Sequence, residues 1–277
     1  KRVKRMDFKY LLFEVKDNVA VITLNRENKL NAINGKMFDE IYEALDEIAN
    51  NKEIRAAIIT GKGRAFSTGG DFNQASQGMA GDIDSVEDGG KMQSGEIEID
   101  VSQKRLVLKL QRTPKPIIAA INGLALGGGL NIALNCDLIY AAQNAELGTF
   151  FMKRAIIPEM SSTYILPRIV GIHKAKELIF FGDRFSAQEA LKMGLINGVF
   201  PVEEFMNKVM EVAEKLAKGP TFSIGLAKLI INKVLEEKTI QALENEAEAL
   251  FKAFDSEDFT EGLLAFFEKR DPEFLGR

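Results

Sequence analysis

Two glycine-rich segments carry the residue types best suited to binding an anionic oxygen. One covers residues 64–71 (Arg-Ala-Phe-Ser-Thr-Gly-Gly-Asp), and the other runs from Asn122 to the glycine triplet at 127–129. Glycine lets the backbone approach a ligand closely, and main-chain N–H groups near the start of a helix attract negative charge. Together the two segments predict an oxyanion hole. Either segment alone is also compatible with a tight turn or with close helix packing.

One carboxylate occurs in apolar surroundings. Glu159 lies in residues 157–162 (Ile-Pro-Glu-Met-Ser-Ser), just before a helix-like run at 164–170. A carboxylate placed in this way is suited to proton transfer, and we favour that interpretation. The alternative is a structural role at a helix N-terminus, with the two serines as caps. Asp71 is interpreted as a turn or cap residue rather than as a second acid.

The sequence excludes several other kinds of chemistry. It contains one histidine, His173, and one cysteine, Cys136. These are too few for a histidine-based zinc site, a thiolate cluster or an internal disulfide. His173 is interpreted as a surface or capping residue, and Cys136 as a small buried group. The sequence has neither a Walker A motif nor a Gly-x-Gly-x-x-Gly loop. We therefore expect no metal site and no redox cofactor.

Charge and composition limit the class of protein further. The chain has 36 basic and 40 acidic residues, a net charge of −4, which leaves no basic surplus for a nucleic-acid backbone. Its apolar runs are too short to span a membrane, and we find no secretory signal. With a single cysteine, a reducing, cytoplasmic location is expected. Residues 1–5 precede Met6 and are interpreted as an incomplete or processed end.

Continuous apolar runs predict strands that are buried on both faces. These runs cover residues 19–24, 56–60, 116–122 and 137–142, and they end in polar or glycine-containing turns. Apolar residues from Met37 to Ile48 recur at three- and four-residue spacing, which predicts an amphipathic helix. The alternation of strands with helices predicts an α/β fold with a mostly parallel sheet.

Two longer regions differ from this pattern. Residues 72–103 are rich in glycine and acidic side chains and are interpreted as a mobile loop or lid. After Val202 the spacing predicts four helices, around residues 205–216, 224–235, 243–254 and 259–269. Their apolar faces exceed what this tail can easily bury alone. We therefore expect a core domain at 7–200 and a helical oligomerisation region at 201–277.

These features resemble the crotonase, or enoyl-CoA hydratase/isomerase, superfamily. The similar segments keep their order along most of the chain and cover residues 22–26, 31–32, 65–71, 121–129, 136–137, 186–195 and 267–274. The resemblance implies a spiral of ββα turns with a helical C-terminal region. It also implies an acyl-CoA thioester as substrate and a homotrimer or a dimer of trimers as the assembly.

The resemblance implies roles for particular residues. Gly70 and Gly128 match the two residues whose N–H groups hold the thioester carbonyl oxygen. The segments that line the CoA site in the family correspond here to those containing Arg26, Ala32, Ala65 and Ser67. Near the C-terminus, Phe267 and Lys269 match residues that contribute to CoA binding across subunits.

Departures from the family pattern bear on the reaction. Family hydratases carry two glutamates, and the matching positions here hold Asn131 and Phe151, neither of which transfers a proton. Glu159 instead resembles the glutamate base of the Δ3,Δ2-enoyl-CoA isomerase branch. This favours isomerisation of a 3-enoyl-CoA to a 2-enoyl-CoA through an enolate, without a cofactor. A one-glutamate hydratase or other crotonase-type lyase or hydrolase, and a non-catalytic acyl-CoA-binding protein, are the alternatives.

Overall fold

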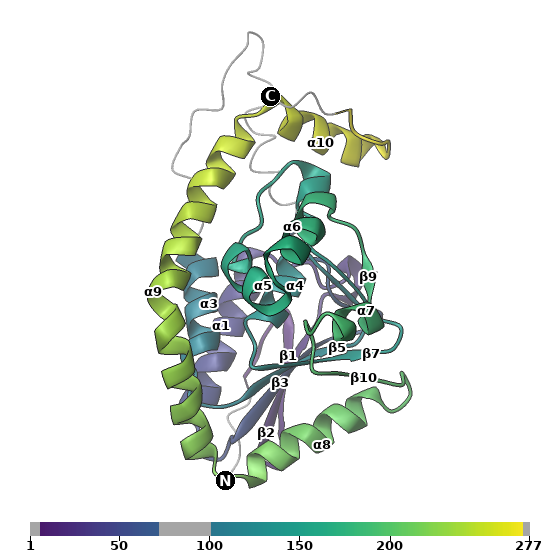
Figure 1. Ribbon diagram of the computed structural model, residues 1–277. Coiled ribbons are helices and arrows are strands. Elements are labelled where there is room, and N and C mark those ends of the chain that lie inside the picture. The colour runs from purple at the N-terminus through teal and green to yellow at the C-terminus, as the bar shows by residue number, and fades with distance from the viewer. Residues whose placement is uncertain (1–5, 72–100, 274–277) are drawn as a thin grey trace.

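The fold is built from pairs of strands that feed two separate sheets. A computed structural model describes residues 6–71 and 101–273, and Figure 1 shows its ribbon. In successive units along the chain, a longer strand is followed by a short one. The longer strands are β3 (Ala56–Gly61), β5 (Ile117–Ile121) and β7 (Leu138–Ala142), and the short strands are β4 (Ala65–Ser67), β6 (Leu124–Leu126) and β8 (Glu146–Gly148).

The longer strands form a six-stranded sheet and the short strands a four-stranded sheet. The strand orders are β1-β2-β3-β5-β7-β10 and β4-β6-β8-β9. Among the described strands, β1 pairs with β2 and β8 with β9 in antiparallel fashion, and the other pairs are parallel. The added strands are β1 (Leu11–Lys16), β2 (Val19–Leu24), β9 (Phe185–Ser186) and β10 (Gly198–Phe200). The predicted α/β fold with its ββα turns is confirmed.

The six-stranded sheet is buried on both faces, as the apolar runs predict. Alternate residues of β3 point to opposite layers: Ala57 and Ile59 belong to the core shared with α1 (Gly35–Asn50) and α3 (Val101–Arg112). Ala56 and Ile58 instead pack with α8 (Phe205–Lys218). Because side chains alternate across a strand, a run that is apolar apart from Thr60 fits a helix layer on each face.

The amphipathic helix α1 forms as its spacing predicts. Asn34 caps it by accepting a hydrogen bond from the N–H of Met37, at 2.9 Å. Its apolar positions from Met37 to Ile48 are buried against the sheet. The shorter helices are α4 (Gly128–Leu134), α5 (Ser162–Val170), α6 (Ile172–Phe181), α7 (Ala187–Lys192), and the 3-10 turns η1 (Glu27–Lys29) and η2 (Met152–Arg154).

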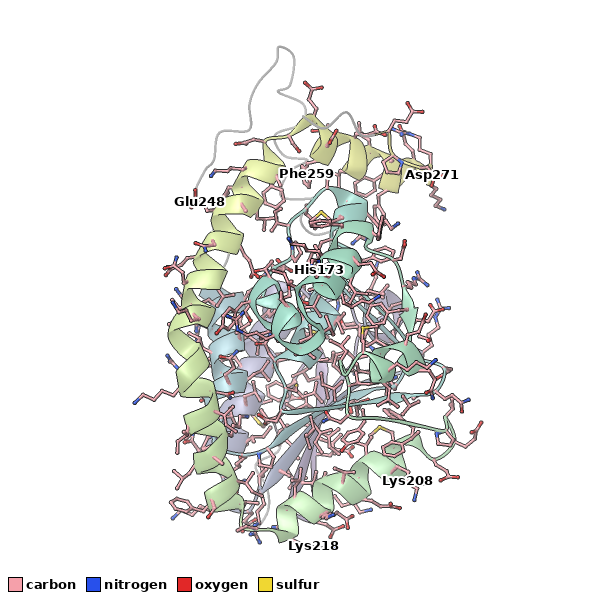
Figure 2. The ribbon with its side chains drawn as sticks, viewed as in Figure 1. His173, Lys208, Lys218, Glu248, Phe259 and Asp271 are labelled. Carbon is pink, nitrogen blue, oxygen red and sulfur yellow. The ribbon has the colours of Figure 1, made fainter. Side chains whose placement is uncertain are left out.

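The residues set aside as non-catalytic in the sequence analysis occupy the expected surroundings. His173 is the second residue of α6 and is exposed; it is labelled in Figure 2. Cys136 is partly buried against the larger core, and burial raises the pKa of its thiol. A thiol with a raised pKa is a poor nucleophile, which agrees with the interpretation of Cys136 as a packing residue.

The C-terminal helices differ from the prediction in number. After α8 the chain forms one long helix, α9 (Thr221–Phe254), and then α10 (Glu257–Glu268). The two middle helices predicted at 224–235 and 243–254 are therefore wrong, because they are parts of α9. No glycine or proline occurs between Gly225 and Gly262, so nothing in the sequence breaks the helix where its apolar face shifts.

In Figure 1, α9 runs along one side of the molecule from α8 to α10, and α3 lies beside it. Near the start of α9, the Lys228 ammonium donates to the Asp137 carboxylate at 2.8 Å, which anchors the helix beneath β7. Burial raises the pKa of Asp137, and the nearby Lys228 charge opposes that rise.

Several segments interpreted from the sequence lie partly or wholly outside the described residues. Most of the predicted loop at 72–103 lies outside the described residues, although its last residues belong to α3, so the loop prediction is wrong there. Residues 1–5 and Phe274 also lie outside the described part. Within the described ranges, no helix is both long enough and apolar enough to cross a bilayer.

Candidate active site

A pocket opens where the parallel short strands end. Gly70 follows β4, Gly128 follows β6, and Phe150 and Phe151 follow β8, so one edge of the small sheet supplies all of them. Ligands of open parallel sheets bind at the carboxyl ends of the strands. The pocket encloses about 490 Å³, open mouth included, and also contacts Glu159, Arg154, and Leu250 and Phe254 of α9.

The two glycine-rich segments meet at this pocket. Gly69 has φ +87° and Gly127 has φ +51°, conformations that side-chain-bearing residues adopt only with strain. The N atom of Gly70 lies 3.9 Å from the point where a Cβ on Gly128 would sit. Among the described residues, the N–H groups of Gly70 and Gly128 have no hydrogen-bond acceptor. Two main-chain donors without an acceptor therefore belong to residues that line the pocket, and the oxyanion hole stays a prediction.

The Glu159 carboxylate lies beside these amides. Its Oε1 is 3.4 Å from the Cβ position of Gly128, and its Oε2 accepts a hydrogen bond of 2.9 Å from Nε2 of Gln103 on α3. The structure thus brings together the three residues expected to be catalytic: Gly70, Gly128 and Glu159. Sequence reasoning missed Gln103, because it falls at the end of the segment interpreted as a loop.

The backbone of Glu159 is held by groups from two helices. Its carbonyl accepts hydrogen bonds of 2.8 Å from Nδ2 of Asn131 on α4 and of 2.8 Å from the Ser162 hydroxyl. Glu159 itself precedes α5 rather than belonging to it. Asn131 is fully buried and occupies a position where family hydratases carry a glutamate. In this chain that position anchors the residue that carries the carboxylate.

Phe151 is the other departure from the hydratase pattern. Its side chain is 5% exposed and lines the pocket. It packs in a small apolar cluster with Ile156, Leu250 and Phe259. Figure 2 labels Phe259 on α10, which lies over this end of the molecule. Helix α9 therefore forms part of the pocket wall, and α10 packs against that wall through Phe259.

Arg154 is a further pocket residue that the sequence analysis did not select. Its guanidinium lies 4.8 Å from the ring centre of Phe266 and 5.8 Å from that of Phe150. Burial lowers the pKa of Arg154. A basic group surrounded by aromatic rings adds positive potential to the same pocket that holds the Gly70 and Gly128 amides.

The segment with Arg26 and Ala32, expected to contact CoA, lies against residues 69–71, which follow β4. Arg26 donates to the Ala32 carbonyl and to the Asp71 carboxylate, the latter at 2.6 Å. Asp71 therefore pairs with Arg26 and is not the turn or cap residue that the sequence suggested. The main chain pairs as well: Ile33 N–H donates to the Gly69 carbonyl at 2.8 Å. These contacts hold Gly70 in place, and the binding of CoA by Arg26 and Ala32 stays a prediction.

The other four residues assigned to CoA binding lie in two places. Ser67 is buried and donates to the Asn31 carbonyl at 2.8 Å, and the Ala65 carbonyl accepts from Asn31 Nδ2 at 2.8 Å. Phe267 is exposed near the end of α10, and Lys269 is its C-cap residue. The structure does not bring Phe267 and Lys269 to the pocket, and their predicted role across subunits stays a prediction.

Removing the Gln103 amide is expected to weaken catalysis without unfolding the protein. Gln103→Leu keeps the side-chain size but deletes the donor that orients Glu159, so we expect kcat to fall about 10- to 100-fold, since a hydrogen bond to a charged group contributes ~1.5–3 kcal/mol. Steady-state kinetics measure this effect. Gln188→Leu makes the same change at an exposed position of α7 and serves as the control. Equal kcat values for the two variants would contradict the orienting role.

Comparison with known proteins agrees with this fold. The sequence model of the enoyl-CoA hydratase/isomerase family matches residues 14–277. A short-chain-enoyl-CoA hydratase of Clostridium acetobutylicum is 35% identical over 97% of this chain and 98% of its own length. A 1,2-epoxyphenylacetyl-CoA isomerase of Escherichia coli is 33% identical over 97% and 99%, respectively.

Solved structures show the same architecture. The crystal structure of an enoyl-CoA hydratase from Mycobacterium avium subsp. paratuberculosis superposes with a TM-score of 0.82 at 28% identity, covering 97% of this chain and 99% of that one. The fold, with its paired glycine segments, is that of the crotonase superfamily. Within it, the chain belongs to the enoyl-CoA hydratase/isomerase family and is an enzyme of that family. The alternative of a non-catalytic acyl-CoA-binding protein is not retained.

Proposed function

We propose that this enzyme isomerises 3-enoyl-CoA thioesters to 2-enoyl-CoA thioesters, with Glu159 as the acid–base group. The observation that supports this most directly is the position of the Glu159 carboxylate. Its Oε1 lies next to Gly128, and Gly70 and Gly128 line the same pocket. A thioester oxygen held by these donors would present its α-carbon near the carboxylate.

The reaction needs one proton to leave one carbon and return to another. Glu159 removes a proton from C2, and the electrons of that C–H bond enter a dienolate spread over C1 to C4. Gly70 and Gly128 stabilise the oxyanion, each donor contributing about 3–4 kcal/mol to the transition state. The protonated Glu159 then gives the proton to C4, so the double bond ends between C2 and C3. The chain supplies every group that this step uses.

The replacement of both hydratase glutamates supports isomerisation over two-glutamate hydration. Asn131 donates to the Glu159 carbonyl, and Phe151 fills an apolar cluster, so neither position carries a group that activates water. The alternative is a hydratase in which Glu159 alone activates water. The Clostridium acetobutylicum relative is named a hydratase, and the Escherichia coli relative is named an isomerase of a different CoA ester, 1,2-epoxyphenylacetyl-CoA, so the names alone do not choose between the two reactions.

A product screen separates the two reactions. Purified enzyme would be incubated with matched 2-enoyl- and 3-enoyl-CoA esters, and the products would be resolved by mass spectrometry. We expect the 3-enoyl esters to be converted without a change in mass, faster than the 2-enoyl esters gain the mass of water. If water addition is the faster reaction, the enzyme is a one-glutamate hydratase and the proposal is wrong.

We further propose that the enzyme assembles as a homotrimer or a dimer of trimers. Large apolar side chains of α9 are exposed, among them Phe222 at 81%, Ile230 at 67% and Ile231 at 63%. Exposed apolar groups on one helix favour burial against another subunit. Light scattering coupled to size-exclusion chromatography tests this assembly, and a monomer at micromolar concentration would contradict it.

A further inference from the structure

One face of α9 contacts both the pocket and the turn that carries Glu159. Leu250 and Phe254 line the pocket, and Glu246, one helical turn before Leu250, lies on the same face. Leu243 on this face is buried in the larger core. Glu246 is 5% exposed, so α9 places a carboxylate in an otherwise apolar contact. Burying a carboxylate is costly unless hydrogen bonds compensate for the lost water.

The Glu246 carboxylate receives its hydrogen bonds from the start of α5. Its Oε2 accepts from the N–H of Ser161 at 2.8 Å, and its Oε1 accepts from the N–H of Thr163 at 2.9 Å and from the Thr163 hydroxyl. The first N–H groups of a helix have no acceptor within the helix. Ser161 is the N-cap residue, but its hydroxyl donates to Asn135 instead of capping. Glu246 therefore supplies the cap from α9.

The capped turn has a backbone conformation that needs external support. Met160 has φ +55° and Ser161 has φ +61°, so two consecutive residues with side chains are in the left-handed region. Such conformations persist only where surrounding contacts hold them. Asn135 holds the Met160 carbonyl at 3.1 Å, and Glu246 holds the next N–H groups. Glu159 is the residue immediately before this turn.

The charge of Glu246 also supports its role as the cap of α5. Burial raises the pKa of Glu246, whereas the donors from Thr163 and Ser161 act against that rise. The ionised side chain accepts all three donors, and a carboxylate at a helix N-terminus is also stabilised by the helix dipole. An amide of the same size has one oxygen, so its NH₂ group would face a backbone N–H. Glutamine at this position would keep the packing but lose part of the cap.

We propose that Glu246 is a positioning residue for catalysis. By capping α5 from α9, it holds the Met160–Ser161 turn so that the Glu159 carboxylate faces the Gly70 and Gly128 amides. The packing of α9 would thereby help to set the position of the Glu159 carboxylate. This inference rests on the proposed role of Glu159.

The test compares Glu246→Gln with two controls on α9. Glu248→Gln makes the same chemical change at an exposed side chain that projects away from the body in Figure 2. Asn232→Ala removes a 2.8 Å hydrogen bond to the Gln111 carbonyl, 14 residues before Glu246 on α9, and leaves the three donors to Glu246 in place. We expect Glu246→Gln to lower kcat for isomerisation about 10- to 100-fold while KM changes less than about threefold. A misplaced Glu159 carboxylate weakens the transition state more than it weakens substrate binding.

The controls separate positioning from stability. Asn232→Ala is expected to lower Tm by about 2–4 °C with kcat within twofold of the wild-type value. Glu248→Gln should change neither quantity. If Glu246→Gln retains kcat within twofold, the inference is wrong. If Glu246→Gln fails to fold, Thr163→Val provides the test in its place. This variant removes one donor to Glu246, and an unchanged kcat would overturn the inference.

A double substitution distinguishes this inference from the proposed function. If Glu246 acts through Glu159, Glu246→Gln should have no further effect on turnover in a Glu159→Gln background. A wild-type enzyme without isomerase activity, or a fully active Glu159→Gln, would refute the proposed function itself. An inactive Glu159→Gln alongside a fully active Glu246→Gln would refute only the role of Glu246.

Discussion

Glu159→Gln is expected to lower kcat for 3-enoyl-CoA isomerisation by at least about 1,000-fold. General acid–base catalysis contributes roughly 10²- to 10⁴-fold, and here one group both removes and returns the proton, so both steps lose it. The amide is nearly isosteric, and its oxygen still accepts the Gln103 hydrogen bond, so the pocket should keep its shape. Initial rates on a 3-enoyl-CoA, together with the Kd of a non-reactive acyl-CoA, measure the two effects separately.

The binding measurement makes this result specific to the chemistry. We expect the Kd to change less than about threefold, because the Gly70 and Gly128 donors are untouched. Glu248→Gln, on the exposed side of α9, serves as the control for losing a carboxylate elsewhere. Turnover of Glu159→Gln within tenfold of the wild-type rate would exclude Glu159 as the base.

Gly128→Pro is expected to lower kcat about 100- to 1,000-fold, because it deletes one of the two oxyanion donors. The loss of one such donor costs ~2.7–4 kcal/mol in the transition state. Gly128 is the first residue of α4, a position where proline is well tolerated since the N–H there has no acceptor within the helix. Kinetics on the same 3-enoyl-CoA, with Tm as a check on folding, test this expectation.

Two alanine substitutions in the same glycine triplet complete the comparison. Gly128→Ala keeps the N–H, and its Cβ would meet its nearest neighbour, Glu159 Oε1, at 3.4 Å, so we expect a smaller loss of kcat than for the proline variant. Gly129→Ala would place a Cβ 2.3 Å from the Ser67 carbonyl oxygen, so α4 could not pack on β4. Gly129→Ala should therefore lower Tm as well as kcat. A proline variant no slower than Gly128→Ala would contradict the oxyanion role.

Local patterns were sufficient to predict four strands of the larger sheet, β2, β3, β5 and β7, and the α1 helix. The buried runs from Val19 and from Ala56 contain no charged residue and one threonine each, and strands covered on both faces accommodate such runs. In the C-terminal region, the spacing of apolar residues predicted a helix break between residues 235 and 243, where the apolar face of α9 shifts. Periodicity reports which face is buried, and α9 changes its packing partners along its length without ending, from α8 to α3 and then to α5 and α10.

By itself, the sequence determined the fold class, the family resemblance and the residues expected to react. Gly70, Gly128 and Glu159 could be selected because each belongs to a local motif whose chemistry depends on residue type and immediate neighbours. Gln103 and Glu246 could not, because they reach the Glu159 segment across 56 and 85 residues of chain, respectively. Only the tertiary structure decided those contacts, since the packing of α3 and α9 against the turn before α5 brings side chains together that no local spacing relates.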